Sequence, residues 1–275
     1  MTVEKAYAKI NLFLRIEGKR PDGYHDLTSV MQTVSLHDTV AIRRRDDKEV
    51  TLSCGVPALS GSDNLCVRAA LAFLRRFGTG GCDIALTKRI PWGAGLGGGS
   101  ADCAAVLRGM NRLYGTGAET KDLETLGAAL GADVPFLVSG GTALARGIGE
   151  ILTPLPRLKG AHILIIEGKD KISTPEAYGR IDAIKTEERC IPDHAPIIRA
   201  VESGNVREIG SLLFNDFESV YGRDERYDLC KSAAGVCLTG SGSAVFALFS
   251  DLSDLKKALE RARKAGYMAH ACHMI

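Results

Sequence analysis

The stretch Pro91-Trp-Gly-Ala-Gly-Leu-Gly-Gly-Gly-Ser100 places five glycines among the seven residues 93–99. A loop of this composition lets backbone N–H groups approach an anion closely, and a following helix adds its positive dipole end and unpaired donors. The residue pattern predicts such a helix over 100–114 and a strand over 82–90. We therefore interpret the stretch as a phosphate-binding loop; the alternative is a loop that is merely flexible.

Two better-known phosphate loops fit this stretch poorly. A Walker A loop requires a lysine after its last glycine, and this loop has none there. Gly93-x-Gly95-x-x-Gly98 matches the dinucleotide pattern, with Glu119 near the expected acidic distance. However, the predicted helix leads into another helix and not into the second strand of a βαβ unit. Dinucleotide binding stays an alternative.

Two charged residues stand in otherwise apolar surroundings. Asp133 lies in the run Ala128-Ala-Leu-Gly-Ala-Asp-Val-Pro-Phe-Leu-Val138, and a buried ionised carboxylate needs partners. Its alternative role is to cap the short turn that begins at Val134. Lys9 lies on the polar face of an alternating strand over 6–16, and long charged side chains seldom point inward unless they are paired. Lys9 is therefore a candidate partner for Asp133, or else a surface residue whose ammonium reaches water.

The remaining pattern predicts an α+β chain of two domains, 1–155 and 156–275, with the boundary at Pro154 and Pro156. The last strand could pack back on the first domain. We expect residues 43–49 to form a charged, solvated hairpin tip. We expect strands at 6–16, 50–53, 82–90, 161–167, 235–239 and 244–250, a strand pair within 27–42 and a short final strand, with helices at 63–77, 100–114, 121–130, 175–183, 195–203, 206–221, 224–232 and 252–265.

The composition excludes several classes of function. Of the 275 residues, 45% are apolar and 25% charged, which is typical of a globular protein and not of a disordered one. The 35 Lys and Arg nearly balance the 33 Asp and Glu, so no field for nucleic-acid binding exists. No apolar stretch could span a bilayer, the first five residues lack a signal-peptide core, and the eight cysteines show no CxxC spacing. We expect a cytoplasmic protein that binds neither nucleic acid nor membrane.

Three segments together resemble the GHMP kinase superfamily, which includes galactokinase and the homoserine, mevalonate and phosphomevalonate kinases. They are Ala8-Lys-Ile-Asn-Leu-Phe-Leu14, Pro91-Trp-Gly-Ala-Gly-Leu-Gly-Gly-Gly-Ser-Ala101 and Leu238-Thr-Gly-Ser-Gly-Ser-Ala-Val-Phe246. Four further strings resemble the branch whose substrate carries cytidine diphosphate: Arg20-Pro-Asp-Gly-Tyr-His25, Asp63-Asn-Leu-Cys-Val-Arg-Ala-Ala70, Leu130-Gly-Ala-Asp-Val-Pro-Phe136 and Gly147-Ile-Gly-Glu-Ile-Leu-Thr-Pro154. The likeness covers most of 6–154 and a short stretch near 240, and 185–230 carries none.

The resemblance implies the two-domain α+β GHMP kinase fold with its active site in the interdomain cleft. It implies that ATP, with Mg²⁺, phosphorylates the 2-hydroxyl of 4-diphosphocytidyl-2-C-methyl-D-erythritol in non-mevalonate isoprenoid precursor biosynthesis. The partner would be this small-molecule substrate with its cytidine diphosphate group, and the chain would be a monomer or homodimer. Two alternatives are another GHMP activity, such as homoserine kinase, and a catalytically silent nucleotide-binding module.

The resemblance also assigns roles to particular residues. Asp133 would act as a base toward the substrate hydroxyl or orient it, and Lys9 would pair with Asp133 and hold that hydroxyl. No protein metal ligand is assigned, although Ser100 could touch Mg²⁺. Substrate would be bound by Asn11, Tyr24, His25, Thr174, Tyr178, Gly240 and Ser241. ATP would be bound by Asn64, Lys88, Pro91, Gly93, Ala94, Gly95, Leu96, Gly97, Gly98, Gly99, Ser100 and Ala101.

Most of the substrate assignments have a plainer alternative. Tyr24 and His25, expected to grip the cytosine, could be ordinary turn packing. Tyr178, expected to stack on the same base, could be a helix core residue. The segment 238–246 could be no more than a tight strand–turn–strand.

Overall fold

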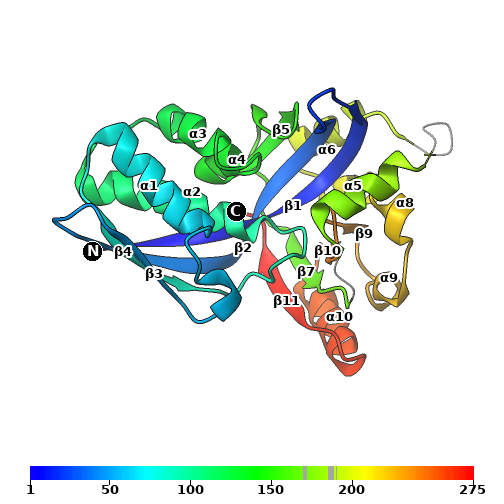
Figure 1. Cartoon of the computed structure of the whole chain (residues 1–275). Helices are drawn as coiled ribbons and strands as arrows, with labels where there is room; N and C mark the ends of the chain where they lie inside the picture. The colour runs from blue at the N-terminus through cyan, green and yellow to red at the C-terminus, as the bar shows by residue number, and fades with distance from the viewer. Residues whose placement is uncertain (170–171, 185–188, 190) are drawn as a thin grey trace. The chain divides into compact units, whose positions relative to one another are not determined.

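The computed structural model describes residues 1–169, 172–184, 189 and 191–275 (Figure 1). The chain divides into two compact units, and neither is one run of sequence. Unit 1 comprises residues 1–8, 37–90 and 97–140, and unit 2 comprises 9–36, 91–96 and 141–275. Strands β1 (Thr2–Lys19) and β2 (His25–Arg44) contribute residues to both units. The boundary that we predict near residue 155 is a single cut of the chain, and it stays a prediction.

Unit 1 is built on a sheet in which β4 (Cys82–Thr87) lies between two other strands. It pairs antiparallel with the second half of β2 and parallel with β3 (Val50–Cys54). The expected hairpin tip at 43–49 is therefore wrong, because β4 separates the strands on either side of that segment. Parallel pairing of β3 with β4 requires a long crossover, which a sequence pattern of short strands does not reveal.

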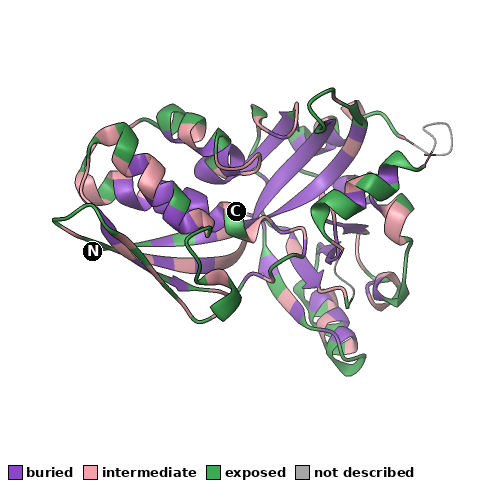
Figure 2. Ribbon diagram, in the orientation of Figure 1, coloured by how far each residue is buried: buried purple, intermediate pink, exposed green. Residues whose placement is uncertain are grey.

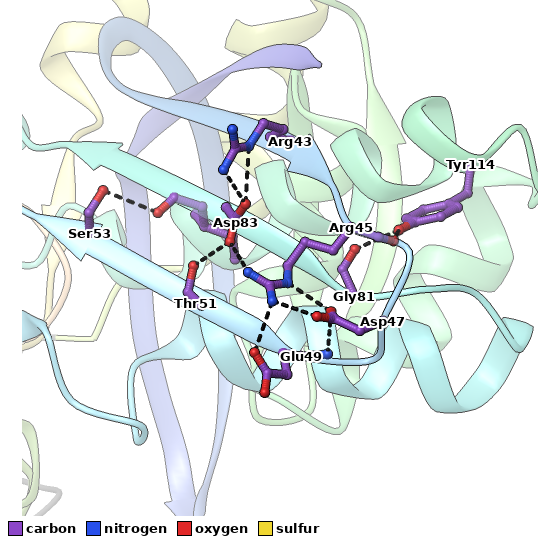
Figure 3. A network of polar contacts seen from close by, with 10 residues as sticks. Arg43, Arg45, Asp47, Glu49, Thr51, Ser53, Gly81, Asp83 and Tyr114 are labelled. Atoms are coloured by element: carbon purple, nitrogen blue, oxygen red, sulfur yellow. Dashed lines mark hydrogen bonds and ion pairs between the residues drawn. The ribbon is translucent and has the colours of Figure 1, made fainter.

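The charged side chains near this crossover neutralise one another (Figure 3). Asp83 on β4 accepts hydrogen bonds from Arg43, Arg45 and Thr51. Arg45 also pairs with two acidic side chains of the following loop. The hydrogen bonds from Thr51 and the arginines lower the pKa of Asp83 to about 2. This balance of charge agrees with a solvated face and not with an anion-binding site.

Helices cover one face of this sheet in Figure 1. The longest, α2, is buried along most of its length, and a Cβ atom on Gly109 would lie 2.5 Å from Cδ1 of Ile42 on β2. Such close packing needs a glycine at that turn of the helix. The helical elements of unit 1 are η1 (Pro57–Leu59), α1 (Leu65–Phe77), α2 (Gly98–Tyr114), α3 (Thr120–Ala128) and α4 (Val134–Ser139).

The described strands form two sheets. The first has seven strands, β3 and β4 among them, and its part in unit 2 has the order β8-β1-β2-β5-β6, with β8 parallel to β1 and β5 antiparallel to both of its neighbours. The second is antiparallel in the order β11-β7-β10-β9. Figure 2 shows buried residues along β7 and β10. The strands are β5 (Thr142–Arg146), β6 (Ile151–Leu155), β7 (His162–Ile166), β8 (Phe214–Asn215), β9 (Gly235–Leu238), β10 (Val245–Phe249) and β11 (Ala269–His273).

Two apolar clusters hold the helices of unit 2 in place. One packs α10 on the second sheet through residues such as Leu164, Phe249 and Leu255. The other joins α5 and Phe217 to the apolar side chains of β1, including Leu14. The helices are α5 (Thr174–Asp182), α6 (Ala195–Ser203), α7 (Val206–Ser211), α8 (Glu218–Tyr221), α9 (Glu225–Leu229) and α10 (Leu252–Lys264).

Two expected elements are corrected by the structure. Residues 27–42 form one continuous strand and not a pair, because this segment contains no residue that forces a turn. The expected helix over 206–221 is broken into α7, β8 and α8. The break lies at Asn215, whose buried side chain accepts the N–H of Phe217 and donates to Leu238 O and Gly240 O. Such side-chain bonding to the backbone competes with a helix.

Candidate active site

The first half of the glycine-rich loop is held by close backbone contacts within unit 2. Gly93 and Gly95 have backbone φ angles of +68° and +79°, which residues other than glycine rarely adopt. A Cβ atom on Gly95 would lie 2.0 Å from the carbonyl oxygen of Thr239. The N–H of Ala244 donates to the carbonyl oxygen of Ala94 at 3.2 Å. Conformation and close approach therefore require these glycines, which excludes a merely flexible loop.

The second half of the loop becomes the first turn of α2 in unit 1. Gly97, with φ of +68°, is the N-cap, and the helix begins at Gly98. No side chain in the described part of the chain forms a capping hydrogen bond there. The first N–H groups of an α-helix lack partners within the helix, and the dipole places positive charge at the same end. The start of α2 is therefore suited to bind an anion.

Lys88, a predicted ATP ligand, is enclosed just before the loop. Its Nζ donates to Oδ2 of Asp102 at 2.7 Å and forms a second ion pair with Asp38. Asp38 also accepts the backbone N–H groups of Arg89 and Ile90. This cluster joins the residues before the glycine loop to the first turns of α2, and so it holds both ends of the loop.

Burial changes the protonation of this cluster. It raises the pKa of the Asp102 carboxyl, and the ammonium of Lys88 offsets only part of that effect. The pKa of Lys88 is also raised, because Asp102 and Asp38 outweigh the opposing effect of burial. The amino group thus stays charged and occupied by carboxylates. The geometry supports a role in holding the loop, and a direct contact with adenosine stays a prediction.

Asp133 stands at the N-cap position of α4 and is half-buried. Its side chain makes no capping hydrogen bond within the described chain, so the capping alternative is wrong. Two residues earlier, a Cβ atom on Gly131 would lie 3.7 Å from Oγ of Ser100. The segment that carries Asp133 therefore lies against the first turn of α2, next to the loop that we interpret as a phosphate site.

Lys9 and Asn11 are buried side by side on β1, with exposed fractions of 4% and 0%. Nζ of Lys9 donates to Oδ1 of Asn11 at 2.8 Å, which excludes the surface alternative for Lys9. Oδ1 of Asn11 also accepts the N–H of Gly240 at 2.9 Å, and its Nδ2 donates to Ser29 at 2.8 Å. The backbone N–H of Lys9 donates to Leu96 O at 3.0 Å. Asn11 thus positions Lys9 and the turn at Gly240, and its direct contact with substrate stays a prediction.

The turn between β9 and β10 is fixed by neighbours from several elements. Oγ1 of Thr174 lies 3.1 Å from Oγ of Ser241, so the structure brings together two predicted substrate ligands. The hydroxyl of Tyr221 donates to the carbonyl oxygen of Ser241 at 2.7 Å. A Cβ atom on Gly240 would lie 2.6 Å from the carbonyl oxygen of Gly95. The turn therefore supports the glycine loop, which a plain strand–turn–strand would not do.

The predicted cytosine ligands His25 and Tyr178 stack on each other. Their ring centroids are 4.6 Å apart, with an angle of 27° between the planes. Tyr178 also meets the ring of Phe217 edge-on at 5.0 Å, so it joins the apolar cluster as well as the predicted site. Tyr24, in contrast, is 61% exposed.

Sequence reasoning missed the acidic side chains that hold these residues. Nε2 of His25 lies 2.6 Å from Oδ1 of Asp182. Asp182 comes four residues after Tyr178 on α5, a spacing that places both on one helix face and could have revealed it. Asp102 could have been found as the single charge in an apolar helical run. Asn64 caps α1, as expected; its Oδ1 accepts the N–H of Cys66, and its predicted ATP contact stays untested.

The chain matches a family of known kinases. The family described as GHMP kinases N terminal domain matches residues 64–141, and GHMP kinases C terminal matches residues 197–267. The matches include the glycine loop and the turn between β9 and β10. Among solved structures, a mevalonate kinase of Methanococcus jannaschii has a TM-score of 0.76 at 17% identity, covering 100% of this chain and 98% of its own, which supports the fold alone.

More similar proteins point to one branch of these kinases. A 4-diphosphocytidyl-2-C-methyl-D-erythritol kinase of Prosthecochloris aestuarii is 43% identical, over 94% of this chain and 92% of its own. A relative of the same name from Caldicellulosiruptor saccharolyticus is 41% identical, over 94% and 91%. A crystal structure of 4-(cytidine 5'-diphospho)-2C-methyl-D-erythritol kinase has a TM-score of 0.84 at 33% identity, over 99% of each chain. The chain therefore belongs to the GHMP kinases and, within them, to the 4-diphosphocytidyl-2-C-methyl-D-erythritol kinase family.

This membership settles the class of the protein. It is an enzyme, a small-molecule kinase that uses ATP, and it has the α+β GHMP kinase fold. Within the described residues, no helix combines the length and apolar character that crossing a bilayer requires.

Proposed function

We propose that this enzyme transfers the γ-phosphoryl group of ATP to the 2-hydroxyl of 4-diphosphocytidyl-2-C-methyl-D-erythritol. Relatives that carry the name of this kinase are 37–43% identical over most of the chain. The phosphate loop alone would fit any GHMP kinase. The observation that carries the choice of substrate is the stacked pair of His25 and Tyr178, because flat rings of this kind stack on nucleobases.

The proposal gives the glycine loop the task of holding the ATP phosphates. Phosphoryl transfer requires mainly positioning and charge stabilisation, with little covalent work by the protein. The turns at Gly95 and Gly97 would aim backbone N–H groups at the phosphates, and the start of α2 would add its dipole. Thr239 and Gly240 lie close to Gly95 in the first half of the loop, and the Lys88 cluster ties the residues before the loop to the first turns of α2.

Asp133 and Lys9 are proposed to act on the substrate hydroxyl. Lys9 is hydrogen-bonded through its backbone to the loop at Leu96, and the segment of Asp133 lies against Ser100. An aspartate that accepts a hydrogen bond from the attacking hydroxyl would orient it toward the phosphorus and could take its proton. Asn11 would keep the ammonium of Lys9 in place.

Mg²⁺ is proposed as the metal that accompanies ATP. No group of three or more His, Cys, Asp and Glu among the described residues could hold a metal ion. Mg²⁺ does not require such a group, since in kinases it is held mostly by phosphates and water and by few protein ligands. Ser100 would be the side chain beside it, and the ion would neutralise charge on the phosphates.

The remaining expectations concern the enzyme as a whole. The cytoplasmic location and the monomer or homodimer state stay predictions from the sequence. Binding of the cytidine diphosphate group would involve Tyr24, His25 and Tyr178, with Thr174 and Ser241 near the diphosphate.

A turnover screen tests the proposed function. The purified enzyme is given ATP and Mg²⁺ with the cytidyl-diphospho-methylerythritol compound, homoserine or mevalonate, and ADP release is measured. We expect turnover with the cytidyl compound alone, with CMP as a competitive inhibitor. Turnover of homoserine would move the enzyme to another GHMP activity, and a lack of turnover with retained ATP binding would leave a nucleotide-binding module.

A further inference from the structure

We propose that Asp182 is a positioning residue that fixes the tautomer of His25 and thereby makes the enzyme select cytosine over uracil. The inference rests on the proposed function, which places His25 beside the base of the substrate. It goes beyond that function because it assigns the choice between two pyrimidines to a carboxylate that does not itself need to touch the substrate.

The geometry around His25 leaves its ring little freedom. The side chain is 6% exposed, and Nε2 lies 2.6 Å from Oδ1 of Asp182. The stack on Tyr178 sets the plane of the ring. Asp182 and Tyr178 both belong to α5. This one helix therefore provides the ring that stacks on the face of His25 and the carboxylate that contacts the edge of His25 at Nε2. The hydrogen bond therefore selects one nitrogen of a ring whose orientation is already defined.

Asp182 is held in its ionised form. Its second oxygen, Oδ2, accepts a hydrogen bond from Nζ of Lys19 at 2.6 Å. Burial opposes ionisation, but the hydrogen bonds from Lys19 and His25 outweigh it and lower the pKa of Asp182. An ionised carboxylate has no proton to donate, so the proton in the short contact must belong to Nε2 of His25.

This requirement determines what the other ring nitrogen can do. In a neutral imidazole with its proton on Nε2, Nδ1 carries a lone pair and accepts hydrogen bonds. No described residue is hydrogen-bonded to Nδ1. A carboxylate behind a histidine fixes tautomers in the same way at metal sites. With the ring neutral and its proton on Nε2, Nδ1 of His25 is an acceptor that a ligand can use, whereas a second proton on Nδ1 would make it a donor.

An acceptor at this position separates the two bases. Cytosine presents an amino group at C4, which donates, whereas uracil presents a carbonyl oxygen there, which can only accept. A lone pair on Nδ1 would accept a hydrogen bond from the amino group of cytosine. Opposite uracil it would face a carbonyl oxygen, which is also an acceptor, and no hydrogen bond would form. Sites that hydrogen-bond a substrate group reject an analogue that lacks it strongly, because a polar atom is then left unpaired.

The test compares Asp182→Asn with Glu176→Gln, which makes the same kind of change at an exposed carboxylate of α5. An asparagine can donate or accept, so it no longer imposes one tautomer on His25. Glu176→Gln is the matched control, because Glu176 is 52% exposed and its ion pair is with Arg180 and not with Asp182 or His25. For each enzyme we would measure inhibition by CMP and by UMP, kcat and KM for the cytidyl substrate, and KM for ATP.

We expect the wild type and Glu176→Gln to prefer CMP over UMP. In Asp182→Asn this preference should fall at least about tenfold, the size of one hydrogen-bond discrimination. The KM for the cytidyl substrate should rise while the KM for ATP stays unchanged, a split that general damage to the fold would not produce. An unchanged CMP to UMP preference in a folded Asp182→Asn enzyme would overturn the inference and leave the proposed function standing.

Two further measurements use only the wild-type enzyme, so they test the proposal even if the variant does not fold. ¹⁵N NMR of wild-type His25 reads the protonation of both ring nitrogens without any variant, and a proton on Nδ1, in a neutral or a charged ring, would overturn the inference even if Asp182→Asn fails to fold. A wild-type enzyme that binds CMP no better than UMP would overturn the inference together with the cytosine pocket. If it also failed to turn over the cytidyl substrate, the proposed function would fall too.

Discussion

At the scale of the residue, Asp133 carries the most direct expectation. Changing Asp133→Asn removes the negative charge and the ability to take a proton but keeps the size of the side chain. We expect kcat to fall at least about 100-fold, the usual contribution of a positioned acid–base group, with ATP binding retained. Steady-state kinetics and ATP titration check this, with the exposed Asp46→Asn as the control. Turnover close to that of the wild type would remove Asp133 from the proposed mechanism.

Single residues also show where sequence reasoning stops. Lys9 and Asp133 could be picked out from the sequence because both lie among apolar residues, and a buried charge is costly unless it has a partner. The sequence could not reveal that Nζ of Lys9 is held by Asn11, or that Lys88 is enclosed by Asp38 and Asp102. These partners are 2, 50 and 14 residues away along the chain, and only the fold brings the distant ones together.

At the scale of the element, the glycine loop can be tested by adding one methyl group. Gly95→Ala would place a Cβ atom 2.0 Å from the carbonyl oxygen of Thr239 and force a side chain into positive φ. We expect ATP affinity to fall at least tenfold, because the loop must move away from the turn that supports it. Gly55→Ala is the control, since no atom lies within 4 Å of its added Cβ. Isothermal titration with ATP measures both, and equal affinities would show that the close approach is not needed.

The buried carboxylate at the start of α2 predicts a particular pH dependence. Burial raises the pKa of Asp102 to about 7. The folded state therefore binds this proton more tightly than the unfolded state, so its contribution to stability is complete below about pH 4 and is lost as the pH rises toward 7. We expect Asp102→Asn to lose this decline. Urea unfolding at several pH values measures it; a decline of the same size in Asp102→Asn would assign the effect to another group.

The elements themselves differ in how well the sequence predicts them. The helices at Leu65–Phe77, Gly98–Tyr114 and Leu252–Lys264 follow the apolar period of 3.6, and each has a residue that caps one of its ends (Asn64, Gly115 and Asp251), so the expected ranges are confirmed within two residues. The long strand β2 and the broken helix around Asn215 were predicted wrongly. Both depend on pairing or hydrogen bonding with distant segments, which local periodicity does not encode.

At the scale of the whole molecule, unit 2 takes its residues from both ends of the chain. Its apolar cluster around Phe217 includes Leu14 and Leu27, and β8 pairs with β1. The second sheet and α10, in contrast, lie wholly within residues 156–275. A cut at the predicted domain boundary would therefore leave one cluster intact and strip the other of its partners.

The fragment 156–275 should accordingly fold only in part. We expect hydrogen exchange to protect β7 and β10, whose pairing partners are all present, and to leave α5 and β8 unprotected, since unpaired backbone and exposed apolar surface are costly. Co-expression with residues 1–155 should restore protection at α5 and β8. Full protection of both in the isolated fragment would mean that the contacts with β1 and β2 are dispensable. Residues 156–275 would then fold without residues 1–155. That result would contradict the structure, in which unit 2 also includes residues 9–36 and 91–96.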